Sequence, residues 1–350
     1  MNKKSTYNVA VVGATGAVGT NILEILEQKD FPINELKVLA SKRSAGKSIR
    51  FKNQEVVIEE ATPDSFKDID IALFSAGGSI SELLAPEAVK HGAVVIDNTS
   101  AYRMQEGVPL VVPEVNKGDI ANHNGIIANP NCSTIQMVTA LKPIKDHFGL
   151  SKVIVSTYQA VSGAGDAAIT ELKTQTEQYL KGEEMEANLL PVKSEEKHFP
   201  IAFNALPQID VFADNGYTLE EMKMINETKK IMHADDLSVA ATCVRLPVFT
   251  SHAESVSIVV DKENVSVQDI WNELEAAPGI KLEDSPAEQL YPTPLSSADK
   301  EEVFVGRVRK DLDDDKQFHL WIVSDNLIKG AALNTVQIAQ ALVDNNWLKK

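Results

Sequence analysis

The sequence predicts an α/β protein with two domains: a doubly wound parallel sheet, and a second α+β domain built on a mostly antiparallel sheet. Apolar strands alternate with amphipathic helices up to about Ala128, which is the pattern of repeated βα units. Beyond that point, strands follow one another with few intervening helices. A length of 350 residues also suits two domains better than one.

Composition narrows the class of protein. The formal net charge of −16 argues against binding to nucleic acid or to an anionic membrane surface. Anionic small molecules remain possible ligands, because a local cluster of arginine and lysine can outweigh the global charge. No apolar run approaches the roughly 20 residues of a membrane helix, and Met1–Thr6 is polar with no signal-peptide core after it. With two cysteines, a disulfide framework is not expected. We therefore expect a soluble, cytoplasmic protein.

The first strand, Tyr7–Val12, runs directly into the glycine-rich turn Gly13–Gly19 and then into a helix with a buried apolar face. Glycines let the backbone approach a pyrophosphate, and free amides at a helix start bind it. The spacing is G-x-x-G-x-x-G rather than G-x-G-x-x-G, and glycine turns also occur for structural reasons. The position between strand and helix nevertheless predicts a dinucleotide site.

The second strand, Leu36–Ala40, leads into the segment Ser41–Ser44. NAD-binding folds usually carry an acidic residue here for the ribose 2′-hydroxyl. Hydroxyls and the guanidinium of Arg43 suit a 2′-phosphate instead, so the pattern favours NADP over NAD. A solvated basic loop is the alternative.

Two further strands, Ile69–Ser75 and Ala93–Ile96, end in polar segments. The first ends in a Gly-Gly turn fit to line a cofactor. The second is followed by Asp97–Arg103, at the edge where open α/β sheets bind ligands. Arg103 could hold a phosphate or carboxylate with two hydrogen bonds, although a single arginine is more often a surface residue.

Cys132 lies at a predicted strand-to-helix turn. The short strand Ile126–Ala128 is broken by Asn-Pro-Asn, and apolar residues recur at helical spacing from Ser133 onward. Free amides and the helix dipole at such a position favour a thiolate and could hold an oxyanion. A half-buried structural cysteine is the alternative, but the turn favours a nucleophile.

The second half of the chain carries most of the remaining strands. A helix is expected over 166–180, an exposed connection over 181–196, and a helix capped by Thr218 and Glu221. The last helix, Ile328–Leu348, should pack on the first domain, so the domains are 1–132 completed by 328–350, and 133–327. The expected strands are Lys152–Ala160, Ser238–Leu246, Ala253–Val260, Val303–Arg309 and Phe318–Val323.

These parts suggest a reaction. A thiolate can attack an acyl group to form a thioester, which a hydride from NADPH reduces to an aldehyde. A histidine near the thiol would take its proton and later protonate or deprotonate the tetrahedral oxygen. Two arginines would hold the anionic ends of the substrate. A hydroxy-acid or amino-acid dehydrogenase would not need Cys132. Spacing alone does not select the histidine; the seven are His91, His123, His147, His198, His233, His252 and His319.

At this point the chain resembles the aspartate-β-semialdehyde dehydrogenase family over essentially its full length. Each matching segment is weak alone, but their order is highly specific. The segments are Gly13–Gly19, Ser41–Gly46, Asn129–Thr134, Gln159–Gly165, Glu220–Lys223, Arg245–His252 and Ser324–Leu327.

The resemblance implies NADPH-dependent reductive dephosphorylation of L-aspartyl-4-phosphate to L-aspartate 4-semialdehyde, in the biosynthesis of lysine and diaminopimelate, threonine and methionine. It implies no metal. The implied roles are Cys132 as nucleophile, His252 as acid/base, Gln159 orienting the acyl group, Arg245 on the carboxylate, Arg103 and Lys223 on the phosphate, Glu220 on the ammonium, and Asn131 beside the thiol.

The resemblance also implies a fold: a Rossmann domain and a glyceraldehyde-phosphate-dehydrogenase-like second domain that forms a homodimer, with a tetramer left open. Cys243 has no implied role and is expected to be a packed strand residue. The implied cofactor residues are Gly13, Thr15, Gly16, Ala17, Val18, Arg43, Ser44, Ser75, Ser162, Gly163 and Asn326.

Three alternatives compete with this interpretation. The reductase that acts on N-acetyl-glutamyl-phosphate shares the chemistry, but its acylated amine offers no cation to Glu220. Glyceraldehyde-phosphate dehydrogenase normally prefers NAD, contrary to Ser41–Ser44. A catalytically silent NADP-binding protein would not need Cys132, Arg245 and His252 together. We expect Glu220 to discriminate strongly, because a substrate without the amine would leave its carboxylate buried and unpaired.

Overall fold

The computed structural model describes residues 4–348, which divide into two compact units. The first contains the chain up to Asn131 together with the stretch from Ala331; the second is Cys132–Gly330. The boundary falls at the peptide bond before Cys132. Within the described part of the chain, no helix is both long and apolar enough to cross a membrane.

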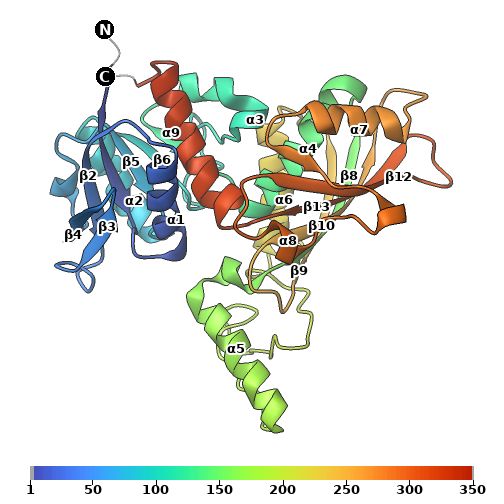
Figure 1. The fold of residues 1–350 in the computed structure, drawn as a ribbon, viewed down its shortest axis with the longest axis horizontal. Helices are drawn as coiled ribbons and strands as arrows, with labels where there is room; N and C mark the ends of the chain where they lie inside the picture. The colour runs from blue at the N-terminus through green and yellow to red at the C-terminus, as the bar shows by residue number, and fades with distance from the viewer. Residues whose placement is uncertain (1–3, 349–350) are drawn as a thin grey trace. The chain divides into compact units, whose positions relative to one another are not determined.

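The first unit is built on a seven-stranded sheet, drawn in blue and teal in Figure 1. Its order is β3-β4-β2-β1-β5-β6-β7, and every pairing is parallel except that of β3 with β4. The doubly wound parallel sheet predicted from the sequence is confirmed. The strands are β1 (Tyr7–Val12), β2 (Ile33–Ala40), β3 (Ser48–Phe51), β4 (Gln54–Glu60), β5 (Ile71–Phe74), β6 (Val94–Asp97) and β7 (Ile126–Ala128).

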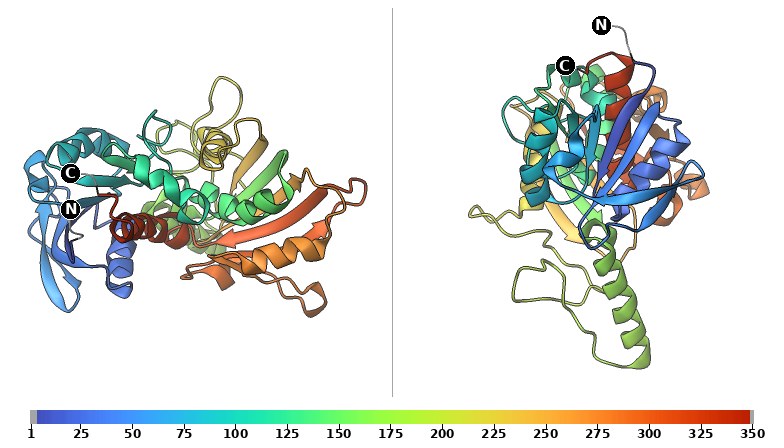
Figure 2. Two further views of the ribbon diagram at one scale, coloured as in Figure 1. Left: turned by 90° about the horizontal axis from the view of Figure 1, so that it is seen from above. Right: turned by 90° about the vertical axis from the view of Figure 1, so that its left-hand side faces the viewer.

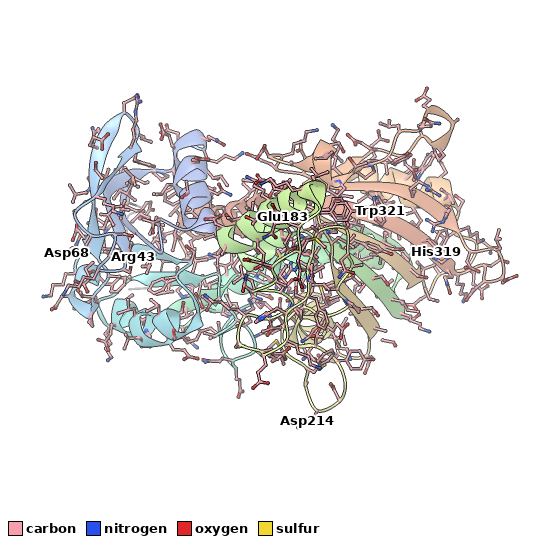
Figure 3. The ribbon with its side chains drawn as sticks, turned by 90° about the horizontal axis from the view of Figure 1, so that it is seen from below. Arg43, Asp68, Glu183, Asp214, His319 and Trp321 are labelled. Carbon is pink, nitrogen blue, oxygen red and sulfur yellow. The ribbon has the colours of Figure 1, made fainter. Side chains whose placement is uncertain are left out.

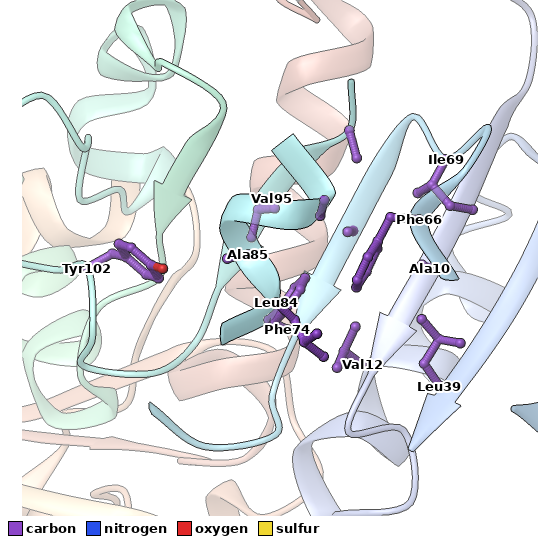
Figure 4. Close-up of a cluster of buried hydrophobic side chains, with 13 residues drawn as sticks. Ala10, Val12, Leu39, Phe66, Ile69, Phe74, Leu84, Ala85, Val95 and Tyr102 are labelled. Atoms are coloured by element: carbon purple, nitrogen blue, oxygen red, sulfur yellow. The ribbon is translucent and has the colours of Figure 1, made fainter. Parts of the chain in front are cut away.

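The edge hairpin of β3 and β4 was not predicted. Most of its side chains are exposed or half-buried, so the apolar pattern that marks the central strands is weak there. The central strands instead pack a dense core, in which the rings of Phe66 and Phe74 stack 5.7 Å apart against Val12, Leu39 and Leu84 (Figure 4). This core holds the ends of β1 and β5 rigidly, where the predicted cofactor turns begin.

The predicted C-terminal helix Ile328–Leu348 is wrong in its bounds. Residues Ile328–Leu333 (η5) form a π-helix, and only Asn334–Asp344 (α9) is α-helical. The Asp325 carbonyl accepts from the amide of Gly330, five residues on, which widens this turn. The other helices of the first unit are α1 (Ala17–Gln28), α2 (Gly78–Lys90), α3 (Pro113–Asn116), and the 3₁₀ turns η1 (Pro63–Phe66) and η2 (Lys117–Asn122).

The second unit is built on a six-stranded mixed sheet of order β11-β12-β13-β10-β8-β9. Its three central pairings are antiparallel, as expected, and the two outer pairings are parallel. The strands are β8 (Lys152–Gln159), β9 (Ser238–Arg245), β10 (His252–Val259), β11 (Ile280–Leu282), β12 (Val303–Lys310) and β13 (Gln317–Ser324).

Helices α4 (Cys132–Phe148), α6 (Leu219–Ile231) and α7 (Val267–Ala276) pack against this sheet. Along β8, buried side chains alternate with exposed or half-buried ones, so one face of the sheet is covered and the other is open. Helix α5 (Asp166–Lys181) projects away from the sheet, as Figures 1 and 2 show. The short helical segments are η3 (Val161–Ala164), η4 (Pro286–Glu288) and α8 (Pro294–Ser297).

Candidate active site

Strand register assembles the polar centre of the second unit. Gln159 on β8 lies opposite Arg245 on the parallel strand β9. On the other side of β8, Ala253 of β10 pairs with Tyr158, which brings His252 alongside Gln159. All three side chains are buried. Because paired residues share a face of the sheet, Arg245, Gln159 and His252 form one row across three strands.

Cys132 is the first residue of α4, as the turn chemistry predicts, and it is half-buried. A Cβ added at Gly330 would lie only 2.8 Å from the Cys132 Cβ, so the backbone of Gly330 packs directly against the thiol-bearing side chain. No sequence motif pointed to this glycine. The charge of Cys132 also acts on Arg245, where it raises the pKa of the guanidinium, so the two groups belong to one site.

His252 is held as a neutral ring. Its Nδ1 accepts a hydrogen bond of 3.0 Å from the Ala160 amide, so the proton of the neutral imidazole is on Nε2. Burial, with the charge of Arg245 next, lowers the pKa of His252 to about 3. Nε2 is buried and has no hydrogen-bond partner among residues 4–348. It is therefore a donor available to an oxyanion.

Arg245 is anchored by the backbone of the same residue, Ala160. Its Nη1 donates to the Ala160 carbonyl over 2.8 Å, while its buried Nε has no partner within the described chain. Burial lowers the pKa of Arg245, and the charge of Glu220 opposes this effect. The backbone N–H and C=O of Ala160 thus orient His252 and Arg245, respectively. Sequence reasoning assigned Ala160 no role, because a backbone contact leaves no side-chain signal.

The structure corrects the expectation that Glu220 lacks a partner without substrate. Its Oε1 accepts from Gln159 Nε2 at 3.1 Å, and its Oε2 lies 3.3 Å from Lys223 Nζ. Lys223 also pairs with Asp210 at 2.9 Å. A substrate without an ammonium group would therefore leave Glu220 with two partners, and the discrimination argued from an orphaned carboxylate is weakened.

Cys243 is fully buried on β9, as expected of a packed strand residue. Burial raises the pKa of its thiol, so it stays protonated. Cys132 therefore remains the candidate nucleophile.

Arg103, in the first unit, is buried rather than a surface arginine. Its Nε donates to the carbonyl of Asn129 at 3.0 Å and its Nη2 to that of Asn98 at 2.8 Å. The Asn129 side chain is in turn bonded to Asn98 and Asn334. This network holds the guanidinium against the turn that leads through Asn131, also buried, to the end of the unit.

The turn between β1 and α1 fits a dinucleotide. Gly13 has φ +83°, and a Cβ there would lie 2.8 Å from the Ala76 amide nitrogen. Gly16 caps α1 without a side-chain hydrogen bond, and no acidic residue lies in the first helical turn. Thr15 and Gly16 are exposed and Ala17 and Val18 half-buried. The helix start therefore presents amides with no side-chain acceptor, as a pyrophosphate requires.

The end of β2 suits a 2′-phosphate. Arg43 is exposed (Figure 3), and the Ser44 amide donates to the Ser41 carbonyl in a tight turn. No acidic residue lies between Ser41 and Lys47. Ser75, at the end of β5, donates through its Oγ to the Val12 carbonyl at 3.2 Å, which ties that turn to β1.

The three cofactor residues predicted in the second unit lie around His252. Asn326 Oδ1 accepts from the Ser251 amide at 2.9 Å, and its Nδ2 donates to Ser162 Oγ at 3.0 Å. Ser251 has φ +69°, so these bonds hold a strained turn before His252. A Cβ at Gly163 would lie 2.9 Å from Arg245 Nη1 and 3.3 Å from His252 Nε2.

Both units of the chain match known protein families. Residues 8–123 match the family described as "Semialdehyde dehydrogenase, NAD binding domain", and residues 141–329 match "Semialdehyde dehydrogenase, dimerisation domain". The aspartate-semialdehyde dehydrogenase of Bacillus subtilis is 64% identical, over 96% of this chain and 97% of its own.

Solved structures agree. Aspartate semialdehyde dehydrogenase II from Vibrio cholerae, complexed with ASA, has a TM-score of 0.92 at 47% identity, over 98% of this chain and 99% of that one. The Candida albicans aspartate semialdehyde dehydrogenase with NADP has a TM-score of 0.73 at 26% identity, over 98% of this chain and 100% of that one.

Proposed function

Because the chain belongs to the aspartate-semialdehyde dehydrogenase family of oxidoreductases, we propose that it reduces L-aspartyl-4-phosphate to L-aspartate 4-semialdehyde with NADPH, through a thioester on Cys132. One observation carries the mechanism: Cys132 begins α4 in the same site as the Arg245 guanidinium. A helix N-terminus and a nearby cation both stabilise a thiolate.

The substrate's charged groups match the charged residues. The Arg245 guanidinium, oriented by the Ala160 carbonyl, binds the carboxylate. Glu220, oriented by Gln159, receives the ammonium, which takes the place of Lys223 on Oε2. Lys223 remains paired with Asp210 and serves the phosphate together with Arg103. Exchange of one ammonium for another explains why Glu220 can be buried and paired before substrate binds.

Because the only ring proton of His252 is on Nε2, the first role of this residue is to donate a hydrogen bond. With Nδ1 occupied by the Ala160 amide, Nε2–H hydrogen-bonds to the oxyanion formed when the Cys132 thiolate attacks the acyl carbon. Phosphate then leaves and the thioester forms. This order differs from the expectation that a histidine takes the thiol proton at the outset. When bound, NADPH supplies the hydride that reduces the thioester carbonyl.

His252 Nε2–H next hydrogen-bonds to the resulting alkoxide, which collapses as the carbon–sulfur bond breaks. That step releases the aldehyde and restores the Cys132 thiolate. The residues of the chain thus return to their starting state, and the outgoing phosphate takes its proton from solvent.

We assign the cofactor to NADP. The free amides at the start of α1 suit its pyrophosphate, and Arg43 and Ser44 suit its 2′-phosphate. The Candida albicans relative with NADP supports this assignment. Ser162, Gly163 and Asn326 are proposed to line the nicotinamide end while also holding His252 in place.

The protein is further proposed to be a homodimer, formed through the open face of the six-stranded sheet. Ile154 is 44% exposed there, and Tyr158 contacts Trp321 (Figure 3) with ring centroids 5.5 Å apart. The matched family is described as a dimerisation domain. A reactive thiol and NADPH both suit the reducing cytoplasm, and the product would feed lysine, diaminopimelate, threonine and methionine synthesis.

The deciding experiment is phosphate-dependent reduction of NADP⁺ with L-aspartate 4-semialdehyde, comparing wild type with Cys132→Ala. Activity should fall to background in the variant, while Cys243→Ala, which removes the buried thiol instead, remains active. Equal activity in Cys132→Ala and wild type would exclude the thioester. A wild type that binds NADPH but is inactive would point to another acyl phosphate or to a non-catalytic role.

A further inference from the structure

Besides Glu220, a second buried acidic residue, Glu254, lies near the row formed by Arg245, Gln159 and His252. Glu254 follows His252 by two residues on β10, so both side chains point to the same face. Its neighbours across the sheet are Thr157 on β8 and Ile322 on β13. Glu254 is 0% exposed, and neither carboxyl oxygen has a hydrogen-bond partner within residues 4–348. Fully buried carboxylates are rare unless they are paired with a cation.

Gln136 is the group that faces this acid. It lies on α4 one turn after Cys132, and its side chain is fully buried beside Glu254. Its Nε2 donates to the His252 carbonyl at 3.3 Å. Because only the NH₂ end of an amide can donate to a carbonyl, Oε1 is directed elsewhere, and it too has no partner in the described chain.

Burial therefore removes the Glu254 carboxyl from water. An ionised Glu254 would lose the hydrogen bonds that water gives a carboxylate, and the contact with Gln136 lowers its pKa too little to compensate. One proton on the carboxyl removes the buried charge.

The surrounding charges agree with a protonated acid. Burial raises the pKa of Glu254 well above its ordinary range, the charge of Glu220 on α6 raises it further, and the contact with Gln136 only partly opposes this. The neighbouring groups on the other elements are the buried Cys243 thiol on β9, whose own pKa is also raised, and the neutral His252 ring on the same strand. None of these groups supplies a compensating cation.

We propose that Glu254 is a neutral carboxylic acid in the working enzyme and that its contact with Gln136 braces the helix of Cys132 against the strand of His252. Gln136 donates through Nε2 to the His252 carbonyl and also contacts the Glu254 side chain. Glu254 is thus a positioning residue that touches neither substrate nor cofactor. The brace rests on the proposed function only in that Cys132 and His252 are the reacting pair.

The protonation state is tested without any assay of activity. From pH 4.5 upward, an unfolded Glu254 is ionised while the folded one keeps its proton, so its contribution to stability falls as the pH rises. Glu254→Gln has no titrating group at this position, so it does not lose stability in this way as the pH rises. Its urea midpoint should exceed that of wild type at about pH 8, and the two should converge near pH 4.5. The matched control, Glu288→Gln, changes an exposed carboxyl in the same way and should show no such pH dependence.

Parallel urea curves for wild type and Glu254→Gln at both pH values would overturn the neutral acid. The infrared difference spectrum between the two proteins gives a second readout. The carbonyl stretch of a protonated carboxylic acid should be present in wild type at about pH 8, and its absence would equally refute the proposal.

The bracing role is tested by the pH profile of Cys132 alkylation with iodoacetamide, since Cys243 is buried. Glu254→Gln keeps a neutral polar group in contact with Gln136 and should retain the wild-type profile and kcat within about twofold. Glu254→Leu removes the polar contact with Gln136; it should shift the profile and lower kcat about tenfold with KM little changed. A Leu variant with the wild-type profile, or a Gln variant as impaired as Leu, would refute the brace. Neither result depends on the identity of the acyl phosphate.

Discussion

Gly330→Ala should damage catalysis by displacing the nucleophile. A Cβ at this position would lie 2.8 Å from the Cys132 Cβ and 3.3 Å from its Cα. Carbon atoms in contact prefer about 3.5–4.0 Å, so the overlap is about 1 Å. Gly330 has no left-handed φ, and the Cys132 side chain and backbone are therefore the main obstacle to an alanine.

The overlap sets the expected size of the effect. Overpacking of this kind costs about 1–3 kcal/mol of unfolding free energy, which the protein should survive. A reacting atom misplaced by about 1 Å can lose about a hundredfold in rate. We therefore expect kcat to fall about a hundredfold while the KM values change little, because the three atoms nearest the new methyl group belong to Cys132 and Asp325 and not to a substrate-binding side chain.

The assay is steady-state kinetics with L-aspartate 4-semialdehyde, phosphate and NADP⁺, joined to the rate of Cys132 alkylation by iodoacetamide. Gly118→Ala is the matched control, because a Cβ there meets no atom within 4 Å. Thermal unfolding of both variants shows whether they fold. Wild-type kcat and alkylation rate in a folded Gly330→Ala protein would refute the argument that this glycine sets the position of the thiol.

Three further predictions follow from the site. Arg245→Lys keeps the charge but not the paired donors, so KM for the semialdehyde should rise about ten- to a hundredfold with KM for NADP⁺ unchanged; an unaltered semialdehyde KM would contradict carboxylate binding. Because His252 has a native pKa of about 3 against 6.5 unfolded, the folded state binds fewer protons in that window, and stability should fall as the pH drops from 6.5 to 3, by at most about 1.4 kcal/mol per pH unit. Urea unfolding of His252→Gln at several pH values should show a smaller fall of unfolding free energy between pH 6.5 and 3 than wild type; an equal fall in both proteins would contradict the buried neutral histidine. Arg43→Ser should raise KM for NADP⁺ about tenfold and leave KM for NAD⁺ unchanged, and a parallel change in both would argue against a 2′-phosphate contact.

Local chemistry made much of the first unit predictable. The apolar runs of the parallel strands, the glycine turn after Val12 and the Asn-Pro-Asn break before Cys132 each lie within a few consecutive residues. Backbone sterics and hydrogen-bonding rules act over that same range, so they identify a strand end or a helix start directly. The edge strands β3 and β4 were missed because their side chains are too exposed to produce an apolar pattern.

The second unit shows what the sequence alone could not decide. Gln159, Arg245 and His252 become neighbours only through the register of three strands. The backbone N–H and C=O of Ala160, which orient His252 and Arg245, have no side-chain signature. The pairing of Glu220 with Lys223 and Gln159, the approach of Gly330 to Cys132 and the burial of Glu254 against Gln136 depend equally on contacts between distant segments. The residue types of the site were therefore determined by the sequence. Their hydrogen-bond partners, protonation states and close packing contacts were decided by the tertiary structure, because hydrogen bonding and desolvation depend on which atoms surround a group in space.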